Sequence, residues 1–542
     1  QLCFLYSILA QIHPASNNRH RTYHYKDYLN TLNIEGLTFP MQVRNVGKFE
    51  KLNPDISVNV LYFNDHDEDD KDRRRDHTEE MFISPLYVSP HRDRKHHVNL
   101  IVIDDGEKTH YLLVTKLSAL VAHRNDHGHA TLVCPYCLSC HQSKDAFNNH
   151  VELCKQHTPQ AVTYPQAPNN ILQFDKYFKR EKVPFVLYCD FESLLVPASD
   201  GKIEHIPSGF CALRASKYPK HNGEPHVYSD PITTPGHVAK NMFDYLEEQE
   251  EYIESALRPN KPMKLTPDDW RDYRNATHCY GCNRSFEFLT KNRDHDHVTG
   301  LYKGAACSRC NLSFKPRKGK SKFTKRDAFF IPVVLHGGSN YDFKLILRDF
   351  STYFSPEEIS VIPNNSERYI GFEIGNFRFI DSCKFLNASL EALVENLHRS
   401  GTDKFHFTKK AFNGSESVFR KGVYPYEYMD KIERFFETEL PPRSAFYSQL
   451  NDRELSEADY QVAQEAWVEF GCKTLRNYHD HYLKLDVTLL ADVFENFREK
   501  AIGAYELDPA HYWTLPGYSW DACLNYTGVK LELLTDAEMY LS

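Results

Sequence analysis

Two acidic residues stand two positions apart at the end of an apolar run, in Phe185-Val186-Leu187-Tyr188-Cys189-Asp190-Phe191-Glu192. The apolar and aromatic residues over 185–190 predict a β-strand. Because side chains alternate along a strand, Asp190 and Glu192 should project from the same face. A second apolar run, 330–335, predicts another strand, and Asp342 follows it at the start of a predicted helix. A third carboxylate could therefore reach the same place.

A helix predicted over 482–498 supplies a fourth carboxylate. Apolar residues recur there at helical spacing, at Val487, Leu490, Phe494 and Phe497. Tyr482 and Asp486, four residues apart, share one face of this helix. Hydrolysis of a phosphodiester with two metal ions needs three or four carboxylates around cations that lie roughly 4 Å apart. We therefore expect Mg²⁺ or Mn²⁺ here, with Tyr482 orienting the attacking water. The expected ligands are Asp190, Glu192, Asp342 and Asp486.

A cluster of cysteines surrounds an acid-histidine segment. The cluster reads Cys279-x2-Cys282-x24-Cys307-x2-Cys310, a spacing typical of a four-cysteine zinc site. Between its two pairs lies Asp294-His295-Asp296-His297, and Asn311 follows the last cysteine. A ββα-metal nuclease needs a histidine to activate water and an oxygen ligand to hold a catalytic cation, while zinc fixes the scaffold. The pattern favours such a nuclease.

On these residues, the segment 275–325 resembles the phage recombination endonuclease VII family. The resemblance implies that Asp294 and Asn311 bind the catalytic Mg²⁺, that His295 is the general base and that the four cysteines hold zinc. An acidic partner in the following helix is not identifiable, so an insert that keeps zinc but has lost cleavage is the alternative. The basic run 315–326 either faces phosphate or is a solvated loop. Its expected DNA contacts are Lys315, Arg317, Lys318 and Lys320.

A shorter cluster, Cys134-x2-Cys137-x12-His150-x3-Cys154, has the ligand spacing of a zinc finger. Tetrahedral zinc can take two ligands from a tight turn and two from successive turns of a helix, which spacings of two and three residues provide. Cys140 and His157 are spare ligands, so the ligand set is not unique. A structural clip and a DNA-reading finger both fit the pattern. Clustered cysteine pairs of this kind favour metal over disulfides.

Three segments resemble the exonuclease motifs of family B DNA polymerases, and occur in that family's order. They are 185–192, 333–342 and 478–498. The closest likeness is to the protein-primed polymerases of Maverick/Polinton elements, related viruses and linear plasmids. Segments 381–393, 421–426 and 508–517 are also similar to this group. The resemblance covers most of 130–542, and it includes the nuclease-like insert between the first and second motifs.

The family resemblance implies a ribonuclease H-like domain that degrades DNA in the 3′→5′ direction. Ser389 and Leu390 would belong to its single-strand-binding motif. The second motif normally carries Asn directly after its histidine, but this chain has Gly337 there, and Asn340 is the nearest substitute. The implied partners are DNA, as a single-stranded 3′ end or a branched duplex, and a protein primer. The family's palm motifs do not occur in these residues, so we expect no polymerisation by this chain alone.

At 542 residues the chain is long enough for about three or four domains. We expect a mixed α/β region over 1–130, a zinc finger over 131–160, an exonuclease domain over 161–255 and 327–500, an endonuclease-like zinc insert over 256–326, and the start of a truncated polymerase domain over 501–542. The first region should open with an amphipathic helix rather than a signal peptide, and contain strands near 57–63 and 98–103.

Composition and charge leave several classes of function open. No apolar run approaches the roughly 20 residues that span a bilayer, so we expect an intracellular, nuclear protein with no membrane partner. The formal charge of -9 does not by itself indicate nucleic-acid binding. Three hypotheses remain: a polymerase fragment with a metal-dependent exonuclease, a structure-selective endonuclease acting through 279–311, and a silent, zinc-stabilised DNA-binding remnant of a mobile element.

Overall fold

The computed structural model divides the chain into two compact units. Unit 1 comprises Gln1–Leu172 and Lys530–Ser542, and unit 2 comprises Gln173–Val529. The residues that the structure describes are 2–64, 82–91, 93–104, 109–120, 132–157, 163–199, 201–230, 236–313, 330–348, 359–365, 368–449 and 452–535. The basic run 315–326, with the predicted DNA contacts Lys315, Arg317, Lys318 and Lys320, lies outside these ranges.

A four-stranded sheet forms the centre of the described part of unit 1, in the order β2-β1-β3-β4. Its strands are β1 (Ile56–Asn64), β2 (Phe82–Tyr87), β3 (His96–Asp104) and β4 (Thr109–Leu113). Helices α1 (Cys3–Ile12) and α2 (Val46–Leu52) bury Phe4 and Phe49 in one apolar core with this sheet. The opening helix and the two strands expected in this region are therefore present.

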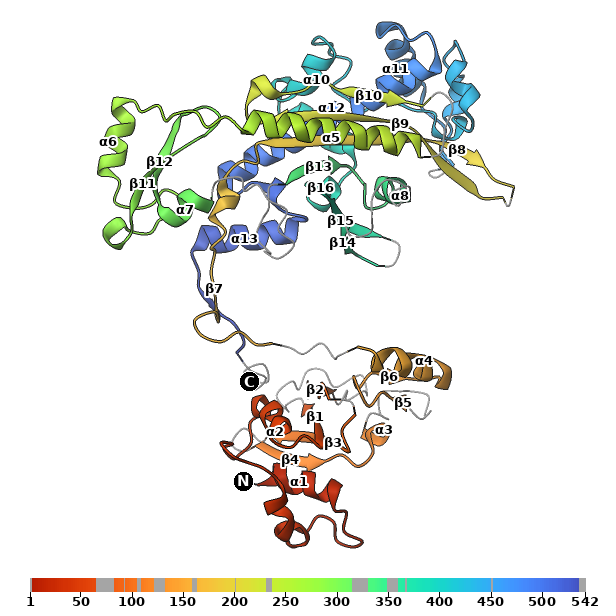
Figure 1. The fold of residues 1–542 in the computed structure, drawn as a ribbon. Coiled ribbons are helices and arrows are strands. Elements are labelled where there is room, and N and C mark those ends of the chain that lie inside the picture. Colours follow the sequence, from red (N-terminus) through yellow and green to blue (C-terminus); the bar gives the residue numbers. More distant parts are fainter. Residues whose placement is uncertain are drawn as a thin grey trace, which may run out of the picture. The chain divides into compact units, whose positions relative to one another are not determined.

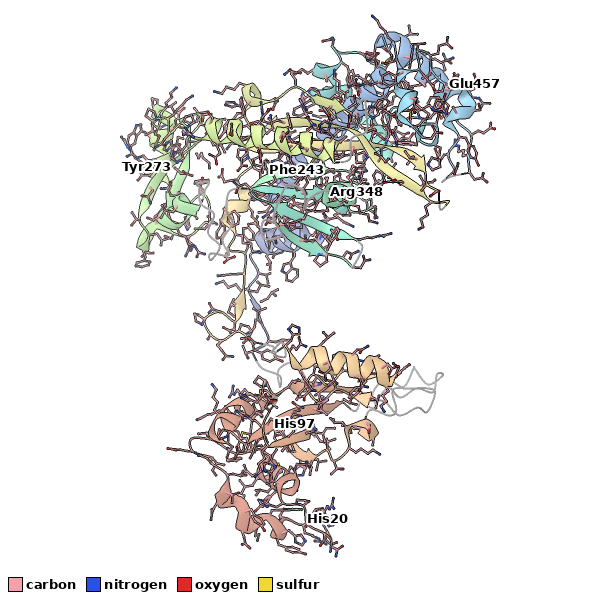
Figure 2. All side chains as sticks on the ribbon, turned by 45° about the vertical axis from the view of Figure 1, so that its right-hand side comes forward. His20, His97, Phe243, Tyr273, Arg348 and Glu457 are labelled. Carbon is pink, nitrogen blue, oxygen red and sulfur yellow. The ribbon has the colours of Figure 1, made fainter. Side chains whose placement is uncertain are left out.

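The cysteine-histidine segment of unit 1 follows this sheet. It contains β5 (Leu132–Val133), β6 (Cys140–His141) and α4 (Lys144–Lys155), after the short helix α3 (Leu117–Leu120). Asn59 of β1 donates to the carbonyl of Pro135 at 3.4 Å and to Nε2 of His97 at 3.0 Å, and Figure 2 labels this histidine. Polar side chains of the sheet thus contact the start of the segment. Strands β7 (Ile171–Leu172) and β17 (Leu531–Glu532) pair antiparallel.

Seven strands make the central sheet of the described part of unit 2, in the order β10-β9-β8-β13-β16-β15-β14 (Figure 1). Their bounds are β8 (Phe185–Pro197), β9 (Ile203–Ser216), β10 (His226–Ser229), β13 (Ile331–Leu335), β14 (Ile359–Pro363), β15 (Tyr369–Ile374) and β16 (Phe377–Asp381). The central strands β8, β13 and β16 are parallel, and the outer strands are antiparallel to their neighbours. The expected mixed α/β class is confirmed.

Two long helices run along this sheet, α5 (His237–Leu257) and α12 (Leu475–Tyr505) (Figure 1). The odd-numbered residues of β8 from Phe185 to Phe191 share a core with α5, including Phe243, which Figure 2 labels. The even-numbered Tyr188 contacts Phe494 of α12, with ring centroids 6.2 Å apart. Alternation along β8 therefore assigns one set of side chains to each helix.

Between α5 and β13 the chain leaves the sheet and forms a small module around the second cysteine cluster. We call residues 259–313 the zinc module and the rest of unit 2 the body. The module contains α6 (Pro267–Asn275), β11 (Lys291–His295), β12 (Tyr302–Cys307) and α7 (Ser308–Ser313), and Figure 2 labels Tyr273 on α6. β11 and β12 form an antiparallel hairpin, and α7 follows β12 directly.

The remaining helices of unit 2 follow β13. They are α8 (Asp342–Arg348), α9 (Leu390–Arg399), α10 (His406–Ala411), α11 (Glu457–Glu469) and α13 (Leu515–Thr527). β15 and β16 form an antiparallel hairpin, and Gly375 turns it with a φ of 57°. None of the helices in the described ranges combines the length and the apolar composition needed to cross a membrane.

Candidate active site and metal centres

Asp190 and Glu192 lie on β8, on the side of the strand that faces α12. Their neighbours Cys189 and Phe191 belong to the core on the opposite side, as strand alternation requires. Glu192 is buried, and Asp190 is half-buried. The pairing of β8 with β9 shifts directly after Glu192, where β9 skips Ser208.

Asp342 is the first residue of α8 and is 4% exposed. Asp381, at the end of the adjacent strand β16, holds the loop that leads to it. The Asp381 carboxylate accepts the N–H groups of Gly337 at 2.9 Å and Ser339 at 3.1 Å. Gly337 has a φ of 82°, a conformation that glycine adopts at no steric cost. Glycine at position 337 therefore suits the shape of the loop.

α12 carries Tyr482 and Asp486, which are both buried. The Oδ2 atom of Asp486 is 3.1 Å from Nζ of Lys421. Its Oδ1 atom is buried and, among the described residues, has no hydrogen-bond partner. Buried polar atoms are nearly always satisfied, because an unpaired one costs free energy. A cation beside this oxygen would remove the deficit.

The four expected metal ligands act on one another electrostatically. Burial raises the pKa of Asp190 well above its usual range, and repulsion from the other three carboxylates raises it further. Burial also raises the pKa of Glu192, with repulsion from Asp486 as the next cause. Burial raises the pKa of Asp342 to about 7. Without cations, this group therefore retains protons that ordinary surface carboxylates have lost at neutral pH.

The four carboxylates are close enough to shift the pKa of Asp190, but their oxygen atoms lie farther apart than the ligand atoms of the two cysteine-rich groups. Among the described residues, only two cysteine-rich groups place three or more ligand atoms within 4.8 Å of one another. A site for two cations roughly 4 Å apart needs ligands distributed around both ions. Oxygen ligands with excess negative charge suit Mg²⁺ or Mn²⁺. The donor set therefore fits the expected metals.

Tyr482 is buried among other tyrosines. Its ring stacks on Tyr424 with centroids 4.9 Å apart, and its hydroxyl lies 2.7 Å from the hydroxyl of Tyr426. The ammonium of Lys421 is 5.6 Å from the centroid of the Tyr482 ring. Burial acts to lower the pKa of Lys421, but the attraction of Asp486, Tyr426 and Asp190 outweighs it and holds the pKa above its usual range. Lys421 is thus a charged amine within this carboxylate site.

Lys421 lies in the segment 421–426, but no sequence pattern assigns it a role at the carboxylate site. The one indication in the sequence is the neighbouring residue, Gly422. A Cβ atom at Gly422 would lie 2.9 Å from the Tyr482 ring, so a larger residue would push this segment away from α12. Glycine there lets the backbone approach the helix closely and brings Lys421 to Asp486.

The three predicted DNA contacts in the described body have different environments. Asn340 is exposed in the loop between β13 and α8. Ser389 is the N-cap of α9, and its hydroxyl accepts the N–H of Ala392 at 3.2 Å. Leu390 is buried. The side chain of Asn340 is therefore open to a ligand, whereas Ser389 and Leu390 already serve the helix and the core. Their contacts with DNA stay predictions.

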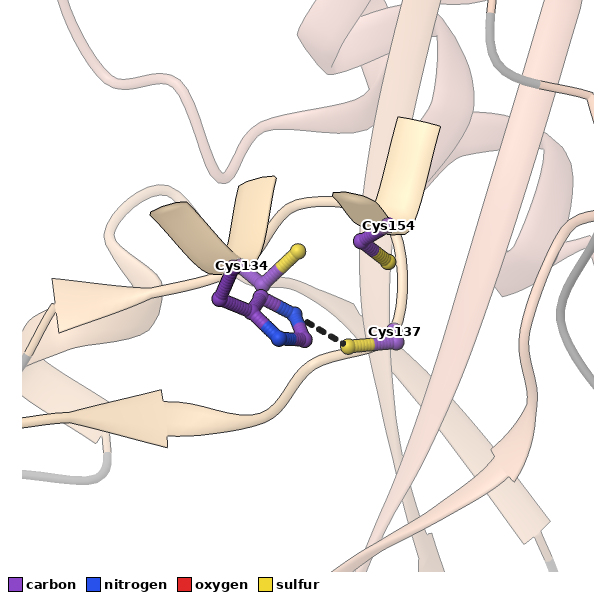
Figure 3. A group of neighbouring side chains, drawn as sticks. Cys134, Cys137 and Cys154 are labelled. Carbon is purple, nitrogen blue, oxygen red and sulfur yellow. Dashed lines mark hydrogen bonds between the residues drawn. The ribbon is translucent and has the colours of Figure 1, made fainter. Parts of the chain in front are cut away.

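Cys134, Cys137, His150 and Cys154 form the first group of metal ligands (Figure 3). The first two come from the turn between β5 and β6, and the last two come from α4. Cys137 Sγ is 3.1 Å from Nε2 of His150, and Ser143 caps α4 through its hydroxyl. Within the described ranges, the spare ligands Cys140 and His157 do not join this group. The arrangement is compatible with zinc.

Cys279, Cys282, Cys307 and Cys310 form the second group, and all four are buried. The backbone N–H of Cys307 donates to Cys279 Sγ at 3.2 Å, and Arg284 donates to Cys282 Sγ at 3.4 Å. Tyr177 of the body packs against this cluster. Donors of this kind stabilise thiolates and orient them for a metal. The group is compatible with a structural zinc ion.

The acid-histidine segment lies at the end of β11. Asp294 is buried, and its carboxylate accepts the Tyr280 hydroxyl at 2.5 Å and lies 3.7 Å from Nζ of Lys303. His295 is half-buried and lines a cavity together with Asp294. In the part of the chain that the structure describes, the Asn311 side chain makes no hydrogen bond to either residue. The structure therefore brings Asp294 and His295 together, while the role of Asn311 stays a prediction.

Gly304 of β12 allows the contact between Tyr280 and Asp294. Its φ is 155°, and a Cβ atom there would lie 2.8 Å from the Tyr280 ring. The tyrosine can cross the strand only where no side chain projects.

A scan of the chain against protein-family models gives no match, and a search of curated proteins also finds no match.

Proposed function

We propose that this protein is a metal-dependent 3′→5′ exonuclease acting on DNA, with its site on β8, α8 and α12. The observation that carries this proposal is the charge imbalance of the site. In the described part of the chain, four carboxylates are accompanied by the ammonium of Lys421, and Asp486 Oδ1 has no partner there. Buried charges normally persist only when they are paired or coordinate metals. Two divalent cations would supply the missing charge.

The resemblance to family B polymerases supports the DNA substrate and the 3′→5′ direction, and makes this chain the nuclease-bearing front of such an enzyme. A mixed sheet with helices on both faces and carboxylates near its centre suits a ribonuclease H-like domain. Mg²⁺ or Mn²⁺ would be held by Asp190, Glu192, Asp342 and Asp486. When bound, the cations lower the pKa of water and stabilise charge on the phosphoryl oxygens.

The chain's own residues would orient the reactants around these ligands. The Tyr482 hydroxyl, held by Tyr426, can position a water molecule beside the carboxylates. Lys421 contributes a fixed positive charge near Asp486, where negative charge would develop on the phosphate. Because most of this site is buried, bulk water would not compete for these contacts.

The exonuclease proposal is tested with a single-stranded DNA labelled at its 5′ end, in Mg²⁺ and in Mn²⁺. Asp190→Asn keeps the shape of the side chain and removes one ligand charge, so the rate should fall at least about 100-fold, or about 2.7 kcal/mol of transition-state stabilisation. Asp403→Asn, at an exposed carboxylate paired with Lys404, is the matched control. Equal rates for the wild type and Asp190→Asn would contradict the proposal.

A second candidate function is an endonuclease centred on the zinc module. Its support is the placement of Asp294 and His295 on one cavity, beside a four-cysteine zinc group. In this function, His295 would accept a proton from the attacking water. Nicking of a closed circular DNA or a four-way junction should then disappear in His295→Ala and persist in Asp190→Asn. DNA binding without cleavage by either site would instead favour the silent remnant.

A further inference from the structure

A cavity of about 380 Å³ separates the acid-histidine segment from the body. The module contributes Asp294, His295 and Asp296 to its lining, and the body contributes Lys217, Tyr218 and Arg258. Arg258 is the C-cap residue of α5, directly before the module begins. The cavity is therefore a composite site, with walls from segments far apart in sequence.

Specific contacts hold the two walls in place. The carboxylate of Asp296 accepts the Tyr218 hydroxyl at 2.7 Å and lies 2.9 Å from Nζ of Lys217. Its other oxygen accepts the N–H groups of Val298 and Thr299, each at 3.0 Å. Burial acts to raise the pKa of Asp296, but the hydrogen bonds from Tyr218 and Lys217 outweigh it and hold the pKa well below its usual range. Asp296 is thus an anchor between module and body.

A second bridge crosses the same boundary. Lys303 of the module lies 2.5 Å from the carboxylate of Glu181 in the body and 3.7 Å from that of Asp294. Arg180 adds a hydrogen bond to the carbonyl of Gly281 at 2.8 Å. Because the module is fixed on both sides of the cavity, the hollow is part of the fold.

Most charged groups around the cavity are already paired, and two are not. Three of its cations have acidic partners: Lys182 with Glu495 at 3.2 Å, Lys217 with Asp296 at 2.9 Å and Lys303 with Glu181 at 2.5 Å. Among the described residues, the Arg258 guanidinium and the ring nitrogens of His295 make no hydrogen bond or ion pair. Arg258 is also exposed. An available guanidinium and an available imidazole therefore line one cavity.

We propose that this cavity binds a phosphodiester of the nucleic-acid backbone between His295 of the module and Arg258 of the body. A guanidinium offers paired N–H donors that match two phosphoryl oxygens, and imidazole adds a third polar contact. The proposal rests on the second candidate function, which makes a phosphodiester the ligand. It adds that the body completes this site, so that Arg258 of α5 is a DNA-binding residue of the module's centre.

The test measures binding of a fluorescently labelled four-way DNA junction by the full chain, in Ca²⁺ to prevent cleavage. Arg258→Ala should weaken binding about tenfold, as expected for loss of one charge-assisted contact. The logarithm of the affinity should also fall less steeply with the logarithm of the salt concentration, with a slope smaller by about one, because one fewer counterion is released on binding. Arg271→Ala is the matched control, because it removes an equal charge from α6 at an exposed ion pair with Asp268 that does not line the cavity. The control should bind within about twofold of the wild type.

Further experiments distinguish a bound phosphodiester from free phosphate, and the binding proposal from the endonuclease proposal. Inorganic phosphate at millimolar concentration should not displace the junction; displacement would assign the cavity to free phosphate and overturn the proposal. Equal binding by Arg258→Ala and Arg271→Ala would also overturn it, even if His295→Ala abolishes nicking and so supports the second candidate function. A tenfold loss in Arg258→Ala by a protein that nicks no DNA would support the binding site and refute the endonuclease.

Discussion

Replacing Lys421 by methionine should lower the free energy of unfolding of unit 2 when no metal is bound. The loss should be smaller when divalent cations are bound. Lys421 is the cation that accompanies four carboxylates, and its ammonium lies 3.1 Å from Asp486 Oδ2. Methionine keeps much of the side-chain volume but removes the charge. The carboxylates would then repel one another without compensation until divalent cations bind.

The size of the effect follows from this ion pair. Opposite charges 3.1 Å apart attract by about 5 kcal/mol at an effective dielectric constant of about 20. Desolvation offsets part of this attraction, and removal of one partner from a buried pair costs about 3 to 5 kcal/mol. We expect a loss of about 3 kcal/mol in the free energy of unfolding. At about 2 °C per kcal/mol, the Tm of the transition should fall by about 6 °C.

The assay is thermal unfolding in EDTA and in saturating Mn²⁺. Mn²⁺ should raise the Tm of Lys421→Met more than that of the wild type, because the ions replace the lost charge. The double variant Lys421→Met/Asp486→Asn should recover part of the loss in EDTA, since it removes one repelling carboxylate. Lys404→Met, at an exposed pair, is the control and should shift the Tm by little. An equal fall in both media would refute this electrostatic reasoning.

Three further predictions concern pH and zinc. Burial raises the pKa of Asp342 to about 7 and also raises the pKa of Asp190 and Glu192, so protons must leave when a cation binds, and Mn²⁺ affinity should fall by about tenfold or more per pH unit below pH 7. Isothermal titration across pH measures this. Burial lowers the pKa of His481 to about 4, so the neutral ring favours the fold. That stability is complete above about pH 6.5 and is lost as the pH falls toward 4, by up to about 3 kcal/mol. His481→Gln should remove this component from acid unfolding curves, and parallel curves for variant and wild type would contradict it. Cys154→Ala should lower the zinc content measured by mass spectrometry by about one ion per chain, while Cys140→Ala should leave it unchanged.

Local patterns made much of the body predictable. The alternation of Ile370, Phe372 and Ile374 before Gly375 specified β15 and its hairpin, because one face of that strand is apolar. The apolar stripe also predicted α12, although the helix begins earlier, at Leu475. Its N-terminal signal was present in the sequence as a capping box between Thr474 and Asn477.

Residues that act through long-range contacts could not be predicted in this way. Lys421 contacts Asp486 because its loop packs closely against α12, and this close packing requires that residue 422 be a glycine without a side chain. Asp381 shapes the loop before Asp342 from the end of a different strand. Neither contact produces a periodic pattern or a fixed spacing along the chain. Arg258 gives no signal at all, because it lines a cavity only after the module has docked on the body.

The net charge of -9 is compatible with the proposed DNA binding because part of the acidity lies at the proposed cation site. If all four carboxylates were ionised, they and Lys421 would give a local charge of -3, but the raised pKa values of Asp190, Glu192 and Asp342 mean that bound protons reduce this negative charge when no cation is present. Two divalent cations bound to the ionised carboxylates would change the local charge to +1. The local field at this site would therefore become attractive for a phosphate only after metal binding. Without metal, the proposed exonuclease site would carry no net positive charge that attracts a DNA strand. Divalent cations would then control access of the substrate as well as the chemistry.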